Sequence, residues 1–150
     1  MLRKLRRLSE LSASELLVFF QLTAFAVAAR FALTFLRLSR VMEFAARGAN
    51  NRFLRCLPLF QIRYEITRLT RLADYAARAT RPDGPCLLRS LLLFWLLKSR
   101  GEAAELLIGV SKEASALNSH AWIETQGNII GDSTEMTGRF APLLRFCTKL

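Results

Sequence analysis

A cysteine, a histidine and an aspartate in the second half of the chain are the residues whose types and settings point to chemistry. Cys86 follows residues 81–85, where two prolines and a glycine end any preceding helix, and it opens a long apolar segment. His120 is the single histidine of the chain, so imidazole acid–base chemistry near neutral pH must use it. Asp132 lies on the next predicted strand. In this order the three residues predict a thiol protease site.

The chemistry follows from the helix start. A cysteine in the first turn of a helix meets unpaired amide hydrogens and the positive end of the helix dipole, which favour thiolate over thiol. His120 as imidazolium would stabilise this thiolate further and protonate a leaving amine. Asp132 would fix the tautomer and orientation of the ring. The same amides would help to hold the oxyanion of a tetrahedral intermediate, and the sequence offers no strong candidate for a second, side-chain donor.

The segment from residue 119 to residue 132 predicts a hairpin that brings the last two residues together. Residues 119–125 alternate, residues 126–128 predict a turn, and residues 129–132 return. With the turn centred on Gln126, His120 and Asp132 face one another with Cβ atoms about 4.5–5.5 Å apart. A slip of one residue would place them on opposite faces of the sheet, so the expected contact depends on this register.

Each residue also has a purely structural explanation. A lone cysteine beside leucines is most often inert core, His120 before Ala121 fits a half-buried strand, and Asp132 fits a turn. The combination of all three in this order favours the catalytic interpretation. Cys56 and Cys147 lack a comparable setting, and we expect them to be structural or incidental.

The elements that must position these residues give an α+β fold. Residues 86–99 are apolar on nearly every side, which is typical of a core helix, and Gly101 supplies its stop. We expect this helix to pack on a small antiparallel sheet that carries His120 and Asp132. Alternating residues should supply the core of that sheet, namely Leu106, Ile108, Val110, Ala121 and Ile123.

The first half of the chain predicts two or three helices. Ser12 or Ser14 caps a helix that runs to about Leu38, and residues 48–51 break the pattern. Residues 58–80 form a second, amphipathic helix. Its apolar face contains Ile62, Ile66, Leu69, Ala73 and Ala76, and its opposite face contains Arg63, Arg68, Arg71, Asp74 and Arg78. The arginines fit either a solvated face or a docking surface.

The net charge of +10 lies entirely in this first half. Residues 1–81 contain 15 Lys and Arg against 5 Asp and Glu, whereas residues 82–150 contain 7 of each sign. We therefore predict a basic helical region, residues 1–81, for partner or substrate docking, and a neutral catalytic core, residues 82–150. The three cysteines show no metal-ligand spacing, so we predict neither a zinc site nor a disulfide framework, and a reducing cytoplasm suits a free catalytic thiol.

A membrane span is the alternative for residues 16–36, which are very apolar. The longest uncharged run, residues 16–29, has fourteen residues, short of the roughly 20 that a spanning helix needs. A secretory signal peptide is not expected either, because no clear small-residue cleavage site follows this run. We expect a buried or interfacial helix, with contact to a membrane surface as the second interpretation.

The catalytic half resembles the C-terminal domain of lasso-peptide leader peptidases, which belong to the transglutaminase-like superfamily. The resemblance covers residues 84–134 and is specific as a block. It consists of a Cys-Leu-x-Arg-Ser helix start, a glycine, an Ile-Gly-Val strand, His-Ala-Trp-x-Glu and a hairpin to Asp. The matching positions are Cys86, Leu87, Arg89, Ser90, Gly101, Ile108, Gly109, Val110, His120, Ala121, Trp122, Glu124 and Asp132.

The resemblance implies a cysteine protease that removes the leader from a ribosomally made precursor peptide, before a partner cyclase closes the macrolactam ring. It assigns Cys86 as the nucleophile, His120 as general base and acid, and Asp132 as the orienting carboxylate. Some family members carry a strand-rich leader-recognition domain, whereas residues 1–81 predict helices. We therefore expect the split form, which needs a separate leader-binding protein. No phosphate-binding glycine loop appears, so no nucleotide or other cofactor is expected.

Two other function classes remain open. Acyl or amine transfer on the same superfamily fold would use the same triad and would leave a new amide or ester where hydrolysis leaves a free carboxylate. A non-catalytic adaptor or membrane-surface protein would tolerate the change Cys86→Ala. Nucleic-acid binding is weaker still, because the arginines are interleaved with a strongly apolar pattern and no recognised motif appears.

Overall fold

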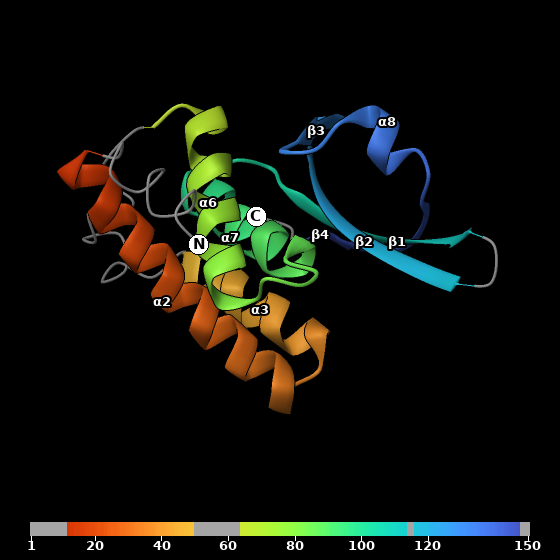
Figure 1. Cartoon of the computed structure of the whole chain (residues 1–150), viewed down its shortest axis with the longest axis horizontal. Helices are drawn as coiled ribbons and strands as arrows, with labels where there is room; N and C mark the ends of the chain where they lie inside the picture. Colours follow the sequence, from red (N-terminus) through yellow and green to blue (C-terminus); the bar gives the residue numbers. More distant parts are fainter. Residues whose placement is uncertain (1–11, 50–63, 114–115, 148–150) are drawn as a thin grey trace.

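The computed structural model describes residues 12–49, 64–113 and 116–147. Within these ranges, long helices gather on one side and a four-stranded antiparallel sheet lies beside them (Figure 1). The helices are α2 (Ala13–Phe35), α3 (Leu38–Ala49), α6 (Ile66–Thr80), α7 (Cys86–Ser99) and the short α8 (Thr134–Thr137). The strands are β1 (Glu105–Glu113), β2 (Ala116–Thr125), β3 (Asn128–Ile130) and β4 (Ala141–Cys147). The predicted α+β class is confirmed.

The first helix begins where the sequence predicts. Ser12 caps α2 in a capping box, in which the Ser12 hydroxyl accepts from the Glu15 amide at 3.3 Å and the Glu15 carboxylate accepts from the Ser12 amide at 2.8 Å. The helix ends at Phe35, and α3 begins at Leu38 as a separate helix that the pattern did not reveal. The buried Glu15 side chain also pairs with Arg68 of α6, which ties the start of α2 to its neighbour.

The amphipathic pattern of α6 has its predicted orientation. Leu69, Ala73 and Ala76 are buried, whereas Arg68 and Arg78 are more than half exposed. The predicted beginning of this helix, from Pro58 through Ile62 and Arg63, lies outside the described residues. In the described part of α6, the exposure of Arg68 and Arg78 shows that the arginine face points away from the core.

The helix that begins at Cys86 is the centre of the hydrophobic core. Leu88 and every residue from Ser90 to Lys98 are buried. Side chains from α2, α3, α6, β1 and β2 pack with those of α7 in one cluster. This core contains residues from both sides of the predicted boundary at residue 81. A helix that is apolar all round is buried because no side of it is suited to water.

The sheet has the strand order β3-β2-β1-β4. β1 and β2 pair along their length, from Glu105 opposite Glu124 to Glu113 opposite Ala116. Of the predicted core residues, Leu106, Ala121 and Ile123 are buried, and Ile108 and Val110 are half-buried. β4 is an edge strand that pairs with β1, and no strand is predicted there from the sequence.

The hairpin has a different register from the predicted one. Ile123 pairs with Ile130 and Thr125 pairs with Asn128, so the turn consists of Gln126 and Gly127 alone. Both turn residues have positive φ, 49° and 79°, as the two-residue turns that match strand twist require. The prediction that the turn is centred on Gln126 is therefore wrong, because the centre lies between Gln126 and Gly127 and the register is shifted by one residue. Asp132 is not the cross-strand partner of His120, because β3 ends at Ile130.

A bend at Gly131 brings Asp132 to His120 despite the shifted register. Its φ of +80° turns the chain out of the strand immediately before Asp132. A Cβ atom at this position would lie 2.6 Å from Cγ2 of Thr70 and 3.4 Å from Cδ1 of Leu93. The turn therefore passes close against α6 and α7, where only a glycine fits. Asp132 reaches its place through this bend and not through strand pairing.

Among the described helices, α2 has the length and composition of a membrane-spanning segment. The helix continues past Arg30 and has 23 residues in all, so it is longer than the fourteen-residue uncharged run, and its length and composition alone fit either a membrane span or a core helix. Core helices of soluble proteins and signal sequences share this length and composition. Only 22% of its most apolar window is buried, so much of α2 faces outward.

The crowding at Gly131 generates a stability prediction with a matched control. Gly127 has almost the same φ, 79°, but open space around it. We expect Gly127→Ala to lower the free energy of unfolding by about 1–2 kcal/mol, the cost of a left-handed alanine, and Gly131→Ala to lower it clearly more. Urea unfolding measures both. Adding Thr70→Ser, which removes the clashing methyl group, should recover part of the difference, and equal losses at the two glycines would contradict the account.

Candidate active site

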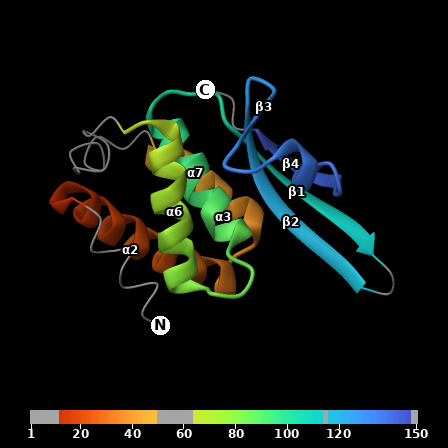
Figure 2. The same ribbon diagram turned by 45° about the horizontal axis from the view of Figure 1, so that its top comes forward.

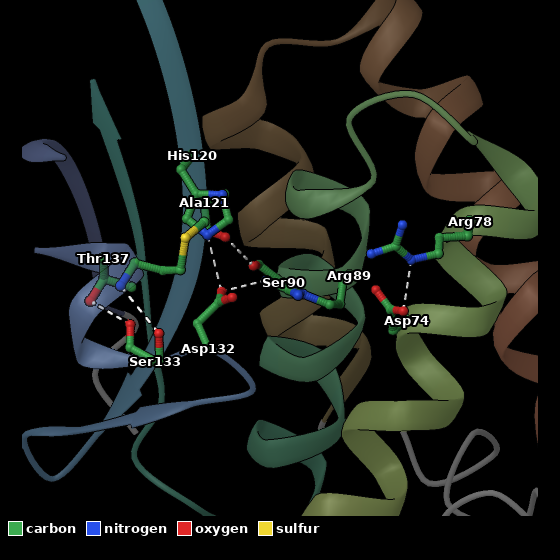
Figure 3. A network of polar contacts seen from close by, with 10 residues as sticks. Asp74, Arg78, Arg89, Ser90, His120, Ala121, Asp132, Ser133 and Thr137 are labelled. Carbon is green, nitrogen blue, oxygen red and sulfur yellow. Dashed lines mark hydrogen bonds and ion pairs between the residues drawn. The ribbon is translucent and has the colours of Figure 1, made fainter. Parts of the chain in front are cut away.

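The start of α7 docks on the open edge of β2. β3 pairs with β2 only at residues 123–125, so the edge of β2 next to Ala121 has no strand neighbour. The Ser90 hydroxyl donates to the Ala121 carbonyl at 2.8 Å, and the Ala121 backbone amide bonds the Cys86 thiol. The helix therefore satisfies both backbone groups that the short strand leaves free. The Ser90–Ala121 hydrogen bond is drawn in Figure 3. Together the two contacts place Cys86 beside the strand of His120.

The Cys86 thiol is half-buried and its pKa is lowered. The largest cause is a hydrogen bond with the His120 side chain, and the backbone amides of Ala121 and Leu87 act in the same direction. Burial acts against them, because it disfavours a charged group. The helix-start effect predicted from the sequence is thus present, but the imidazole contributes more.

His120 lies between the thiol and a carboxylate. Its Nε2 atom is 3.1 Å from Oδ2 of Asp132, and its side chain is 14% exposed. The Asp132 hydrogen bond first, and then the Cys86 hydrogen bond, raise the pKa of His120 to about 9, although burial opposes the shift. Because Nε2 is used by Asp132, Nδ1 is the ring nitrogen left for Cys86. At neutral pH this geometry favours a thiolate–imidazolium pair.

Asp132 holds two cations on one oxygen. Its Oδ2 atom accepts from His120 and from Nη2 of Arg89, and both carboxylate and guanidinium are only 12% exposed (Figure 3). Arg89 comes from the first turns of α7, so the pair ties the loop after β3 to the helix that begins at Cys86. A thiolate, an imidazolium, a carboxylate and a guanidinium then balance to zero net charge, which reduces the cost of burying them.

Arg89 is the site residue that sequence reasoning missed. Arg89 belongs to the motif that resembles the lasso-peptide leader peptidases, but the resemblance assigned it no role. Its spacing of three from Cys86 was an available signal, because residues three apart share one side of a helix. The predicted residues Cys86, His120 and Asp132 are all brought together.

Gly109 of β1 makes room for the aromatic wall of the site. A Cβ atom there would lie 2.8 Å from Cη2 of Trp122 and 2.9 Å from Cβ of Phe140. The Phe140 ring lies 5.2 Å from the His120 ring, and the Trp122 ring stacks at 6.2 Å. Trp122 is oriented by its Nε1 atom, which donates to Glu124 at 3.0 Å. The two aromatic rings limit the rotation of the imidazole.

A cavity of about 310 Å³ opens beside the start of α7. The walls come from the end of α2, from the loop after α6 and from α7, and consist of Arg30, Leu33, Thr34, Arg81, Leu87 and Leu88. The cavity combines apolar side chains with two arginines next to the helix that begins at Cys86. In the part of the chain that the structure describes, no group of three or more His, Cys, Asp or Glu side chains could hold a metal ion.

The paired pKa shifts generate a reactivity prediction. We expect iodoacetamide to alkylate Cys86 at a pH below that needed for a free thiol, whose pKa is about 8.5. His120→Ala should move this reaction to higher pH, because it removes the largest cause of the shift. Peptide mapping by mass spectrometry measures each cysteine separately. Cys147 is an internal control, since a hydrogen bond with Glu105 raises its pKa, and an identical pH dependence at the two cysteines would contradict the ion pair.

The contact between Ser90 and Ala121 generates a second prediction. Ser90→Ala leaves the Ala121 carbonyl buried without its donor, so we expect the free energy of unfolding to fall by about 1–3 kcal/mol. Ser99→Ala is the matched control, because the Ser99 hydroxyl bonds the Leu96 carbonyl of its own helix and should cost less. Chemical denaturation compares the two. If Ser99→Ala lowered the free energy of unfolding as much as Ser90→Ala, the hydrogen bond between the helix and the strand would contribute no more than one within the helix.

Comparison with known proteins agrees with this geometry. The family model described as the transglutaminase-like superfamily matches residues 25–145, from within α2 to β4. Members of this superfamily usually carry a catalytic Cys-His-Asp set, and the match includes Cys86, His120 and Asp132. No curated protein and no solved structure matches the chain. With four fifths of its length matched, the chain belongs to the transglutaminase-like superfamily.

Proposed function

We propose that this protein is a cysteine peptidase that removes the leader from a lasso-peptide precursor. The observation that carries the proposal is the arrangement in which Cys86 bonds His120 and His120 bonds Asp132, with the pKa of the thiol lowered and that of the imidazole raised. The superfamily suggests a cysteine protease or transferase fold. The motif block from Cys86 to Asp132, which resembles the lasso leader peptidases, favours hydrolysis of a leader.

The chemical steps follow from the positions of the groups. The Cys86 thiolate attacks the scissile carbonyl carbon, and the amide hydrogens at the start of α7 stabilise the oxyanion. His120 gives its proton to the leaving amine as the C–N bond breaks, which leaves a thioester on Cys86. Neutral His120 then takes a proton from water as the water oxygen attacks the thioester carbon. The C–S bond breaks, which releases the carboxylic acid and restores the Cys86 thiolate beside the His120 imidazolium. Asp132 keeps the ring oriented, and Arg89 positions Asp132.

The helical region is the proposed docking side for other components. All regular structure in residues 12–49 and 64–80 is helical, which supports delivery of the leader by a separate recognition protein. The cavity beside Leu87 and Leu88 is the candidate entrance for residues next to the scissile bond. A macrolactam-forming cyclase would use the freed amine of the core peptide.

The test is mass spectrometry of a precursor peptide incubated with this protein and its leader-binding partner. We expect one cut at the leader–core junction with a free carboxylate, no cut with Cys86→Ala, and an unchanged cut with Cys147→Ala, because Cys147 is exposed on the edge strand. Turnover should fall as pH rises through about 9, since His120 then loses the proton that the leaving amine needs.

Other products would identify other chemistry. A new amide or ester in place of the free carboxylate would assign transfer. An uncut peptide, with partner binding verified and the fold confirmed by circular dichroism, would contradict the peptidase and favour a non-catalytic adaptor. Cleavage that survives Cys86→Ala would contradict the assignment of the nucleophile.

A further inference from the structure

The outer face of α2 is apolar along its whole length. Its five large apolar side chains recur at helical spacing and are between 46% and 70% exposed, namely Leu17, Phe20, Val27, Phe31 and Phe35. Ala13, Ala24 and Ala28 lie exposed on the same face. We call these eight residues the outer stripe. Soluble proteins rarely leave such a continuous surface uncovered, so it marks an interaction site.

The inner face of the same helix is already used by the fold. Val18, Phe19, Leu22 and Ala26 are buried in the core shared with α6 and α7. The Glu15 carboxylate on this side is buried and paired with Arg68. α2 is therefore apolar on both faces, and in the part of the chain that the structure describes only the inner face is covered.

The outer stripe continues into an apolar cavity. A space of about 270 Å³ lies between α2, α3 and α7, with walls that include Phe25, Ala28, Ala32, Phe44, Leu91 and Trp95. Ala28 belongs to both the stripe and this cavity, and Phe44 at its rim is 60% exposed. A flexible apolar chain lying along the stripe would find space there.

Positive charge lies at the C-terminal end of the stripe. Arg37 and Arg40 follow Phe35 directly and are exposed, and among the described residues neither forms an ion pair. The sequence just before α2 contains Arg3, Lys4, Arg6 and Arg7, and the chain as a whole carries +10. The complement of an apolar stripe with a cationic end, in a basic chain, is a surface with an apolar interior and anionic groups above it. A bilayer of acidic phospholipids has both properties.

We propose that α2 docks this protein on an anionic phospholipid membrane by lying along its surface. The stripe from Leu17 to Phe35 is about 27 Å long at 1.5 Å per residue, enough for several side chains to enter the boundary of the acyl chains. The helix lies in the surface and does not cross it, because crossing would strip its inner face and the Glu15–Arg68 pair from the core. This docking is independent of the proposed peptidase activity.

The arrangement of the molecule is compatible with this orientation. α2 lies at the side of the helical layer away from the sheet in both views (Figures 1 and 2). The strand that carries His120 therefore stays on the side away from the lipid. A membrane-bound molecule would keep the sheet side of its site in water.

The test is flotation of the full-length protein with vesicles. We expect binding to mixed phosphatidylglycerol–phosphatidylcholine vesicles, weaker binding as salt rises, and little binding to pure phosphatidylcholine. The combined change Phe20→Ser, Phe31→Ser and Phe35→Ser should reduce binding at least ten-fold. Leu117→Ser with Leu143→Ser is the matched control, because these leucines are 74% and 64% exposed on the sheet and should not matter. Circular dichroism verifies that every variant is folded.

Four outcomes would overturn the proposal. Failure of the folded wild type to bind anionic vesicles would remove it, and so would an equal loss of binding in the sheet control. Resistance of the bound protein to extraction by alkaline carbonate would indicate a spanning helix. A dimer that the phenylalanine changes dissociate, without any vesicle binding, would assign the stripe to a second copy of the chain. None of these outcomes depends on peptide cleavage.

Discussion

The contact between the first turns of α7 and the open edge of β2 is the interaction on which the rest of the structure depends. α7 is the helix around which the core assembles, and its first turn carries Cys86. The Ala121 carbonyl accepts from the Ser90 hydroxyl, and the Ala121 amide bonds the Cys86 thiol. One residue of the strand therefore holds both the helix and the thiol in place. If β3 were two residues longer, it would occupy this edge and the thiol would lose its strand contact. The short strand is therefore a condition for the site.

A second constraint is electrostatic. Asp132 and Arg89 are each only 12% exposed, and an unpaired charge at such a depth would be costly. The four ionised groups compensate one another, so the site can be enclosed by Trp122 and Phe140 while it stays charged. The same enclosure strengthens each hydrogen bond, because water does not compete for it. The pair of Cys86 with His120 and the pair of Asp132 with Arg89 are in this sense one network.

The helical half shows how one helix can serve two environments. Most amphipathic helices pair an apolar face with a polar face, whereas α2 is apolar on both. Its inner face packs in the core with α7, and its end contributes Leu33 and Thr34 to the cavity beside α7. The basic region and the neutral region of the sequence are thus structurally interdependent, even though their compositions differ sharply.

The sequence alone determined the features that depend on neighbouring residues. The Pro-Gly-Pro stretch before Cys86 defines where α7 begins, the Ser12 capping box defines where α2 begins, and alternation predicts β1 and β2, because each of these signals acts within a few residues. The proximity of Cys86, His120 and Asp132 was also predictable, since chemistry limits which side chains form such a set, and their catalytic roles stay predictions. Even the contact between His120 and Asp132 was predicted correctly, although the register on which it rested was wrong.

Only the tertiary structure decided how that contact is made. The turn at Gln126 and Gly127 shifts the register, so strand pairing does not bring the two side chains together. The bend at Gly131 does so instead, and it needs a glycine because Thr70 of α6 leaves no room for a Cβ atom. The role of Arg89, the pairing of β4 with β1 and the division between α2 and α3 likewise depend on residues far apart in the chain. Local patterns hold no information about such contacts, since their energies exist only after the helices and the sheet have packed together.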